Sequence, residues 1–410
     1  IYLGLYDGSV GTLNIGAAMG EAAVAAGSLY ASQIAFGNGS GTLVFNHTDQ
    51  NYEMNAAITG TGNIRQVGSG TTTITRNNAA FSGMTSVDDG ALIVNGTLRG
   101  SMNVGAARLG GSGTISNVSL GNGSVIAPGS SAGSVGTLTV AGDLAFNAGS
   151  IYEVEVNPVS AANDLIYVTG TAYLNNASVE HVGASGTYPW YMTRTILTAD
   201  GGISGTFGSV ASDYAFLIPD LSYDANNVRM TLLRNDIEFT DVAASSNQQA
   251  VAGAATMLGL GNPIYDQIVT MTAEEAQSAF DALSGEAYSS EGTAAFNAAQ
   301  QLRDVLQARL QVLASGSKVA SLAYAPAAGD ELTGDAPAVW GQVFGTWGVN
   351  DATATAAKLE RRSSGFLGGA DKAIGADSRI GVALGYSHSD FDVKSLLSSS
   401  ESDSFHLAGY

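Results

Sequence analysis

The sequence predicts a mainly β protein: a right-handed parallel β-helix (solenoid) with a β-rich cap, then linker α-helices and an incomplete antiparallel transmembrane β-barrel. Three observations predict this fold class. Among the 410 residues are 53 glycines and only 13% charged residues, and short β-branched or aliphatic runs follow many of the glycines. Helical periodicity replaces these runs after Asn235, and strict alternation of apolar with small residues appears near the C-terminus. The chain is long enough for several domains with a buried core.

Composition restricts the possible partners. The net charge is −20, and the positive residues before Arg303 are seven scattered arginines, so the basic patch that nucleic-acid binding needs is absent. Cysteine is also absent, which excludes disulfides, thiolate catalysis and cysteine-ligated metals. No run of about 18 apolar residues occurs, which excludes a membrane-spanning helix but not a barrel of short alternating strands.

Residues 1–133 are predicted to form solenoid coils. A glycine followed by a short aliphatic run recurs at an uneven spacing of about ten residues or a multiple of it. Glycine can turn the corners, while Val, Ile and Leu stack inward on the coil below. Chance recurrence in a β-rich chain is the alternative explanation. The glycine-led runs lie at 41–45, 60–64, 70–74, 90–94, 100–104, 113–115 and 123–126.

No signal peptide opens the sequence, so we expect Ile1 to be a truncated start.

Residues 134–234 are predicted to cap the solenoid. This stretch is richer in aromatic residues, and its strands alternate clearly enough to be half-buried. A solenoid needs a closed end, and larger aromatic side chains over the last coil would supply one. The expected strands are 137–140, 150–156, 164–168, 194–198 and 227–233.

Residues 235–336 are predicted to be a linker with α-helices. Thr272 and Glu275 form a capping box for a helix that ends near Leu283, before Gly285. A second helix is expected over 286–314, which at 1.5 Å per residue spans roughly 40 Å and could cross an outer membrane if enclosed. An amphipathic helix on a globular core explains its periodicity equally well. Residues 315–336 have the composition of a flexible linker.

Residues 337–410 are predicted to supply the first barrel strands. Between 379 and 387, small or polar residues alternate strictly with Ile380, Val382, Leu384 and Tyr386. That pattern is typical of a membrane barrel strand, apolar toward lipid and small or polar toward the lumen, although a soluble antiparallel sheet also makes it. The candidate strands are 339–348, 364–374, 379–392 and 402–410.

No residue is assigned to catalysis, to a cofactor or to a metal. Residues 129–133 match the Gly-x-Ser-x-Gly nucleophile pattern at Ser131, but no strand-turn-helix context surrounds it. The carboxylate pairs Asp88–Asp89 and Glu153–Glu155 are candidates for glycosidase or lyase chemistry, and solvated strand residues explain them better. The histidines stand far apart, without metal-ligand spacing: His47, His181, His388 and His406.

The order of segments resembles the autotransporters, the type V secretion family, over the whole chain. The motif Ala127-Pro128-Gly129 with 111–115 and 136–140 is similar to the last coils of a family passenger. Segments 149–152 and 163–170 resemble the autochaperone region, and 280–287 resembles a motif found just before family barrels. The stretch 340–345, Trp-Gly-Gln-Val-Phe-Gly, looks like a first barrel strand.

The resemblance implies a secretion module that is not an enzyme. It implies an outer-membrane barrel part and a passenger at the cell surface or secreted, with the outer membrane and the barrel assembly machinery as partners and a host-cell surface as a further one. Neither nucleic acid nor a small-molecule cofactor is expected. We expect about four strands with an unpaired edge, which alone would not form a competent translocator. The alternatives are a surface adhesin whose solenoid binds cells and, more weakly, a polysaccharide-acting β-helix enzyme.

Overall fold

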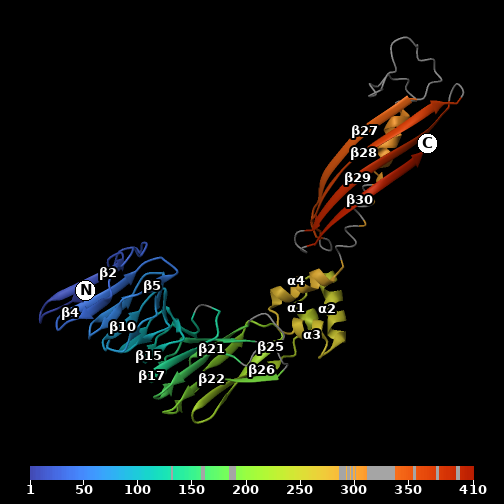
Figure 1. Cartoon of the computed structure of the whole chain (residues 1–410). Coiled ribbons are helices and arrows are strands. Elements are labelled where there is room, and N and C mark those ends of the chain that lie inside the picture. The colour runs from blue at the N-terminus through green and yellow to red at the C-terminus, as the bar shows by residue number, and fades with distance from the viewer. Residues whose placement is uncertain are drawn as a thin grey trace. The chain divides into compact units, whose positions relative to one another are not determined.

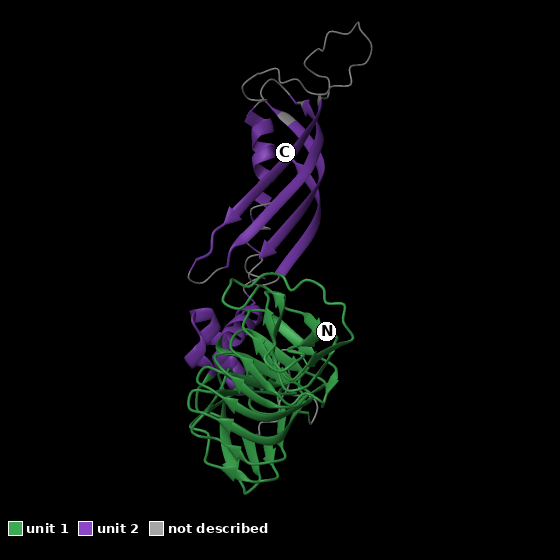
Figure 2. Cartoon of the chain, turned by 90° about the vertical axis from the view of Figure 1, so that its left-hand side faces the viewer, with its two compact units in different colours: residues 1–238, 258–273 green, residues 239–257, 274–410 purple. Residues whose placement is uncertain are grey.

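The computed structural model contains two compact units, Ile1–Glu238 with Leu258–Ala273, and Phe239–Met257 with Glu274–Tyr410 (Figure 2). The structure describes residues 1–130, 133–157, 162–183, 191–285, 292, 296, 299–300, 302–311, 338–353, 357–374, 378–393 and 398–410. The expected linker at 315–336, Ser131 and most of the second predicted helix lie outside these residues.

The first unit is a stack of parallel strands, which confirms the solenoid architecture (Figure 1). Val, Ile, Leu and Phe from successive coils fill its interior, because alternate residues of each strand point inward. In the described residues, one face is a 15-stranded sheet. Its main path is β2 (Val10–Gly16), β4 (Ser40–Asn46), β7 (Asn63–Gln66), β10 (Met84–Val87), β13 (Ser101–Val104), β15 (Thr114–Leu120), β17 (Thr137–Phe146), β19 (Leu165–Val168), β22 (Tyr191–Ala199), β26 (Asn227–Arg234) and β25 (Leu217–Tyr223), with β9 (Asn77–Asn78), β12 (Thr97–Leu98), β20 (Ala172–Tyr173) and β23 (Ile203–Ser204) beside it.

Two further parallel sheets complete the coils. Asn63 pairs with Met84, and Met84 pairs with Ser101, so successive coils follow after 21 and then 17 residues. Turn lengths differ from coil to coil, which is why the glycine spacing in the sequence is uneven. One sheet is β5 (Tyr52–Met54), β8 (Thr71–Ile74), β11 (Ala91–Val94), β14 (Arg108–Gly111), β16 (Val125–Pro128), β18 (Ile151–Val156), β21 (Ser178–Gly183) and β24 (Ser209–Ser212), and the other is β1 (Tyr2–Leu3), β3 (Gln33–Phe36) and β6 (Ala57–Thr59).

The C-terminal end of the solenoid changes to antiparallel pairing. Parallel stacking continues past residue 133 through β17, β19 and β22, and then β26 pairs antiparallel with both β22 and β25. Pro219 lies in the edge strand β25, where a missing N–H weakens pairing with any further strand. Phe146, Tyr152 and Phe207 pack in the interior of these last coils, with ring centroids 5.2–6.4 Å apart. The domain boundary expected at 133/134 stays a prediction.

Short helices follow the cap: α1 (Phe239–Val242), α2 (Ser246–Leu258), α3 (Pro263–Ile268) and α4 (Ala273–Leu283). The last one confirms the helix expected from the capping box, and Gly285, with φ +70°, follows its end. In the second unit α2 contacts α4 through Gln248, whose Nε2 donates to Asp281 Oδ2 at 2.9 Å. No helix among the described residues is long and apolar enough to cross a membrane.

The second unit also contains a four-stranded antiparallel sheet: β27 (Ala338–Asn350), β28 (Leu359–Ala373), β29 (Arg379–Val393) and β30 (Ser398–Gly409), paired in chain order. All four strands were expected from the sequence, and β28 and β30 begin earlier than predicted. This sheet fits part of a β-barrel, and with the parallel stack it confirms the predicted fold class. Helical residues 302–311 pack on one face of it.

Candidate functional site

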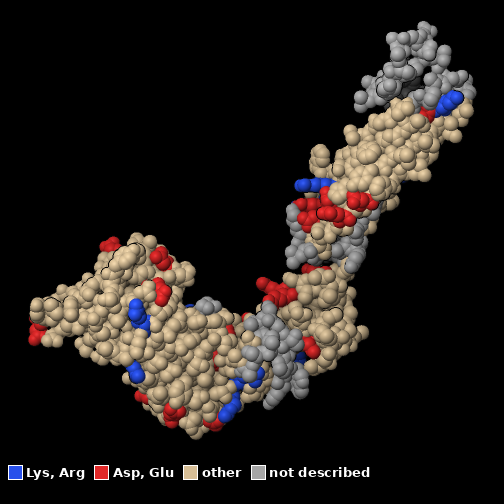
Figure 3. Space-filling view, viewed as in Figure 1, with Lys and Arg blue, Asp and Glu red and all other residues tan. Residues whose placement is uncertain are grey.

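The outward face of the four-stranded sheet is apolar. Val343, Trp347 and Phe405 are more than 80% exposed to solvent in the isolated sheet, and Leu384 is 63% exposed. Charged side chains gather at the two ends of the strands, and the surface between them is uncharged (Figure 3). Exposed apolar area of this extent is unfavourable in water at roughly 25 cal/mol per Å², so this face suits a lipid environment.

A row of aromatic rings crosses three strands on this outward face. Tyr386 lies between Phe366 and Phe405, with ring centroids 6.3 and 5.5 Å away. Its hydroxyl donates to Asp403 Oδ1 at 2.6 Å, so one end of the ring is apolar and the other polar. Aromatic side chains with this division are enriched where a membrane meets water. The row therefore marks one edge of the apolar band.

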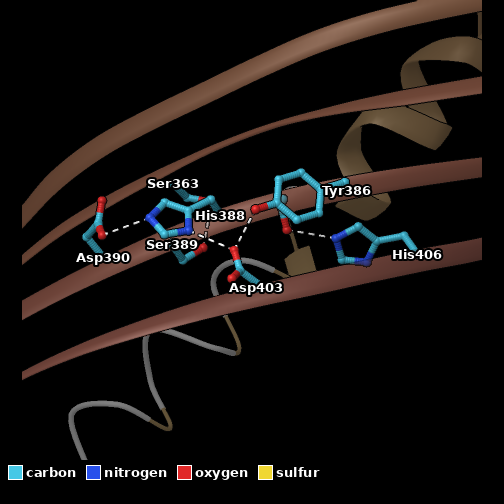
Figure 4. Close-up of polar contacts among 8 residues, drawn as sticks. Ser363, Tyr386, His388, Ser389, Asp390, Asp403 and His406 are labelled. Carbon is cyan, nitrogen blue, oxygen red and sulfur yellow. Dashed lines mark hydrogen bonds and ion pairs between the residues drawn. The ribbon is translucent and has the colours of Figure 1, made fainter.

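A polar cluster lies next to the aromatic row, around His388 (Figure 4). His388 contacts Asp403 Oδ1 through Nδ1 at 2.8 Å and Asp390 Oδ1 through Nε2 at 3.1 Å. Ser387 and His406, with Oγ and Nε2 2.8 Å apart, lie on the opposite face, because neighbouring strand residues alternate. The two aspartates therefore contact His388, whereas the serine contacts His406. These described residues do not assemble a serine–histidine–aspartate triad.

The inward face holds a charged cluster at the end of the sheet where β28 ends. Arg309 Nε and Nη2 donate to Asp371 Oδ2 at 3.1 and 2.9 Å, and the Tyr410 hydroxyl donates to the same oxygen at 3.0 Å. Trp340 Nε1 donates to the Tyr410 hydroxyl at 2.6 Å, and the Arg309 guanidinium lies 5.5 Å from the Trp340 ring centre. We call Arg309, Trp340, Asp371 and Tyr410 the helix clamp.

Apolar contacts support the helix clamp. Val305 is buried against Trp340, Leu367 and Ala383, and Leu302 packs on the same group. Asp371 is 2% exposed, so its charge is desolvated and depends on the partners that the helix supplies. A buried ion pair adds little stability by itself, but it fixes where one element sits on another. The geometry can therefore hold residues 302–311 at one depth on the inner face.

The clamp also sets the direction of the helical segment. Asp371 pairs with Ala338, the first residue of β27, and lies two residues before β28 ends. Arg309 is near the C-terminal end of the segment, so the N-terminal end points toward the other end of the sheet, where β27 ends at Asn350.

The candidate residues that the sequence analysis set aside are dispersed in the structure. His47 and His181 are buried in the solenoid, whereas His388 and His406 lie on opposite faces of the sheet. Within the described residues no group of three or more His, Asp or Glu could hold a metal. The carboxylate pair Glu153 and Glu155 has separate partners, Arg108 and Asp164. The absence of site residues stays a prediction.

Sequence reasoning missed the helix clamp. One signal was available, because Asp371 is a charged residue at an inward position of an alternating strand, where glycine, serine and alanine are usual. Its partner Arg309 is 62 residues away, and no local pattern connects the two.

Comparison with known proteins places these features in a family. Residues 339–410 match the autotransporter beta-domain. Two proteins of Serratia marcescens named extracellular serine protease are each 26% identical to this chain, over 405 and 406 residues, or 86% of it. The adhesin BmaC autotransporter of Brucella suis biovar 1 is 38% identical over 111 residues, covering 26% of this chain and 3% of that protein. The chain spans 37% of the length of the Serratia proteins.

These relatives correct one prediction. The chain was expected to be no enzyme, and proteins that align with 86% of it are named as proteases. The prediction was wrong because it considered only the residues of this chain, which correspond to little more than a third of each Serratia protein. The matched beta-domain, the outward apolar face of the sheet and the parallel solenoid all indicate the same family. The chain belongs to the autotransporter family, with a part that is anchored in the outer membrane and a passenger that is exported to the surface or secreted.

Proposed function

We propose that the helix clamp is the anchor of the passenger in a type V secretion protein. One observation carries the proposal: residues 302–311 are held on the inner face of a sheet whose outer face is apolar. The N-terminal end of this segment points toward Asn350, and the passenger precedes it in the chain. Since the passenger is exported, the Asn350 end of the sheet would face the cell exterior, with the outer-membrane insertion machinery as a partner in assembly.

The remaining parts have supporting roles in this proposal. Residues 1–133 would form the passenger stem, 134–234 its autochaperone-like cap, 235–336 the linker and 337–410 the barrel strands. The antiparallel β25–β26 hairpin supports the role of the cap, because it ends the parallel stack. A stable last coil lowers the nucleation cost of the coils that stack on it, so the cap would fold first and template the stem.

Single cysteines can test the orientation, because the chain has none of its own. In the natural protein expressed in a Gram-negative host, we would introduce Asn103→Cys on the exposed solenoid surface and Ser387→Cys on the inner face of the sheet. A membrane-impermeant maleimide added to intact cells should label the first and leave the second unlabelled. Labelling of Asn103→Cys only after lysis would contradict export of the stem.

A second candidate concerns the passenger. We infer that the natural protein carries a serine protease, because relatives with that name align with 86% of this chain. A fluorophosphonate probe, which reacts with activated serines, should label the secreted natural protein and abolish its hydrolysis of casein. An unlabelled, inactive protein that binds cells would instead favour the adhesin alternative, which the Brucella relative supports over 26% of the chain.

A further inference from the structure

Two carboxyl groups are buried side by side within the parallel coils, one on β18 and one directly before β19. Glu155 on β18 is 5% exposed, and Asp164, directly before β19, is fully buried. The backbone amide of Glu155 donates to Asp164 Oδ2 at 2.9 Å, which holds the two carboxyl groups close together, and Glu155 Oε2 is buried without an amide or hydroxyl donor. A hydrogen bond between two carboxyl groups requires a proton on one of them, because an ionised carboxylate can only accept. Asp and Glu side chains are rarely fully buried unless a partner group compensates for the lost contact with water.

The pair connects three segments of backbone. Asp164 Oδ1 accepts from the Gly136 amide at 2.8 Å, and its Oδ2 accepts from the Glu155 amide at 2.9 Å. Glu155 Oε1 accepts from the Gly133 amide at 3.1 Å. The residues that lead into β17 are thereby tied to β18 and to the start of β19. Loss of the pair would release two glycine amides at this junction.

Arg108 is a charged neighbour of the pair: its hydrogen bond to Glu153 and, less strongly, the charges of Glu155 and Asp164 raise its pKa. Arg108 on β14 donates both terminal nitrogens to Glu153, on the strand of Glu155 but two residues earlier. Tyr152 donates its hydroxyl to the carbonyl of Ile196 at 2.5 Å. Two negative charges in contact inside a protein repel each other and are poorly solvated, so doubly ionised carboxyls are strongly disfavoured. The geometry therefore favours one retained proton.

We propose that Glu155 and Asp164 share one proton and form a proton-dependent latch that ties the segment leading into β17 to β18 and to the start of β19. This goes beyond the anchoring role of the chain and concerns the folding of its exported part. Burial, the largest cause, and the hydrogen bond to Glu155 raise the pKa of Asp164 from 3.8 to about 9. Because the folded pKa is the higher one, the stabilisation is complete below about pH 4 and is lost as the pH rises toward about 9. The latch opens in alkaline medium.

Hydrogen exchange on the full chain in detergent tests the latch. The Gly133, Gly136 and Glu155 amides should lose protection in the wild type as the pH rises from neutral to alkaline, after correction for intrinsic exchange, by up to about tenfold per pH unit. In Glu155→Gln the neutral amide can donate to the Asp164 carboxylate, so protection should stay nearly constant with pH. Glu153→Gln is the matched control, because it removes the Arg108 partner and leaves the shared proton; its pH dependence should follow the wild type.

Infrared spectroscopy supplies a second measurement. At neutral pH the wild type should show the carbonyl stretch of a protonated carboxylic acid, and both Glu155→Gln and Asp164→Asn should lose it. The Asp164→Asn variant keeps the experiment decisive if Glu155→Gln fails to fold. An equal pH dependence of protection in the wild type and in the folded variant, or no protonated carboxyl at neutral pH, would overturn the latch. Neither result bears on the anchoring role, which depends on residues 302–410.

Discussion

The two β regions of this protein differ in which side chains they bury: the solenoid buries aromatic rings, and the outward face of the four-stranded sheet exposes them. In the solenoid, Phe45, Phe81 and Phe146 are fully buried, whereas in the four-stranded sheet Trp347 and Phe405 are more than 80% exposed. The sheet instead buries Ser387, Ser389 and Asp371. Both regions alternate with a period of two, so the pattern alone does not say which face is the core. The solvent on each side decides it, water around the coils and lipid around the sheet.

The largest expected effect comes from truncating a buried aromatic ring of the solenoid, with an exposed ring of the sheet as the comparison. Phe146→Ala removes a fully buried ring that contacts Tyr152 and Phe207, and the cavity should lower the free energy of unfolding by about 3–5 kcal/mol. Phe405→Ala opens no cavity, so only the transfer term of about 1–2 kcal/mol is lost. Denaturant unfolding of both variants in detergent measures the difference. Equal losses would mean that the outward face of the sheet is packed against protein.

An intermediate effect is expected at the helix clamp. Arg309→Met keeps the length of the side chain but removes the two guanidinium hydrogen bonds to the buried Asp371, while the Tyr410 hydroxyl still donates to it. We expect a loss of about 2 kcal/mol in the sheet and a loosened helical segment, because a desolvated carboxylate has lost its charged donor. Trypsin resistance of the second unit in detergent reports the loosening. The exposed Arg362, on the outward face of the same sheet, supplies the control variant Arg362→Met, for which resistance should be unchanged.

The smallest effect is a loss of stability in acid at the cap. His181 is buried, its Nδ1 lies 2.9 Å from Ser212 Oγ, and burial lowers its pKa from 6.5 to about 4. Because the folded pKa is the lower one, its contribution is present above pH 6.5 and is lost as the pH falls toward about 4. One unit below 6.5 the loss is about 1 kcal/mol. The Tm of the wild type should fall there more steeply than that of His181→Gln, and parallel curves would contradict the assignment.

Local patterns predicted much of the fold. The alternation around Val382 and Leu384 identified β29 and its outward face, since a strand's period of two needs no distant information. The capping box at Thr272 located α4 within a residue, because the first turn of a helix depends on its own amides. The uneven glycine spacing hid the coil length, which the turns set separately in each coil. The charge of Asp371 was visible in the sequence, but its meaning depended on a helix 62 residues earlier.

The sequence by itself determined that this is a β-rich autotransporter chain with two kinds of strand, because periodicity, glycine usage and short motifs are local properties. Only the tertiary structure decided which carboxylates are buried together and which helix residue meets Asp371. Contacts such as Glu155 with Asp164 and Arg309 with Asp371 depend on how coils stack and on how deep a helix lies on a sheet. Register and depth arise from the packing of whole elements, and no residue pattern along one strand encodes them.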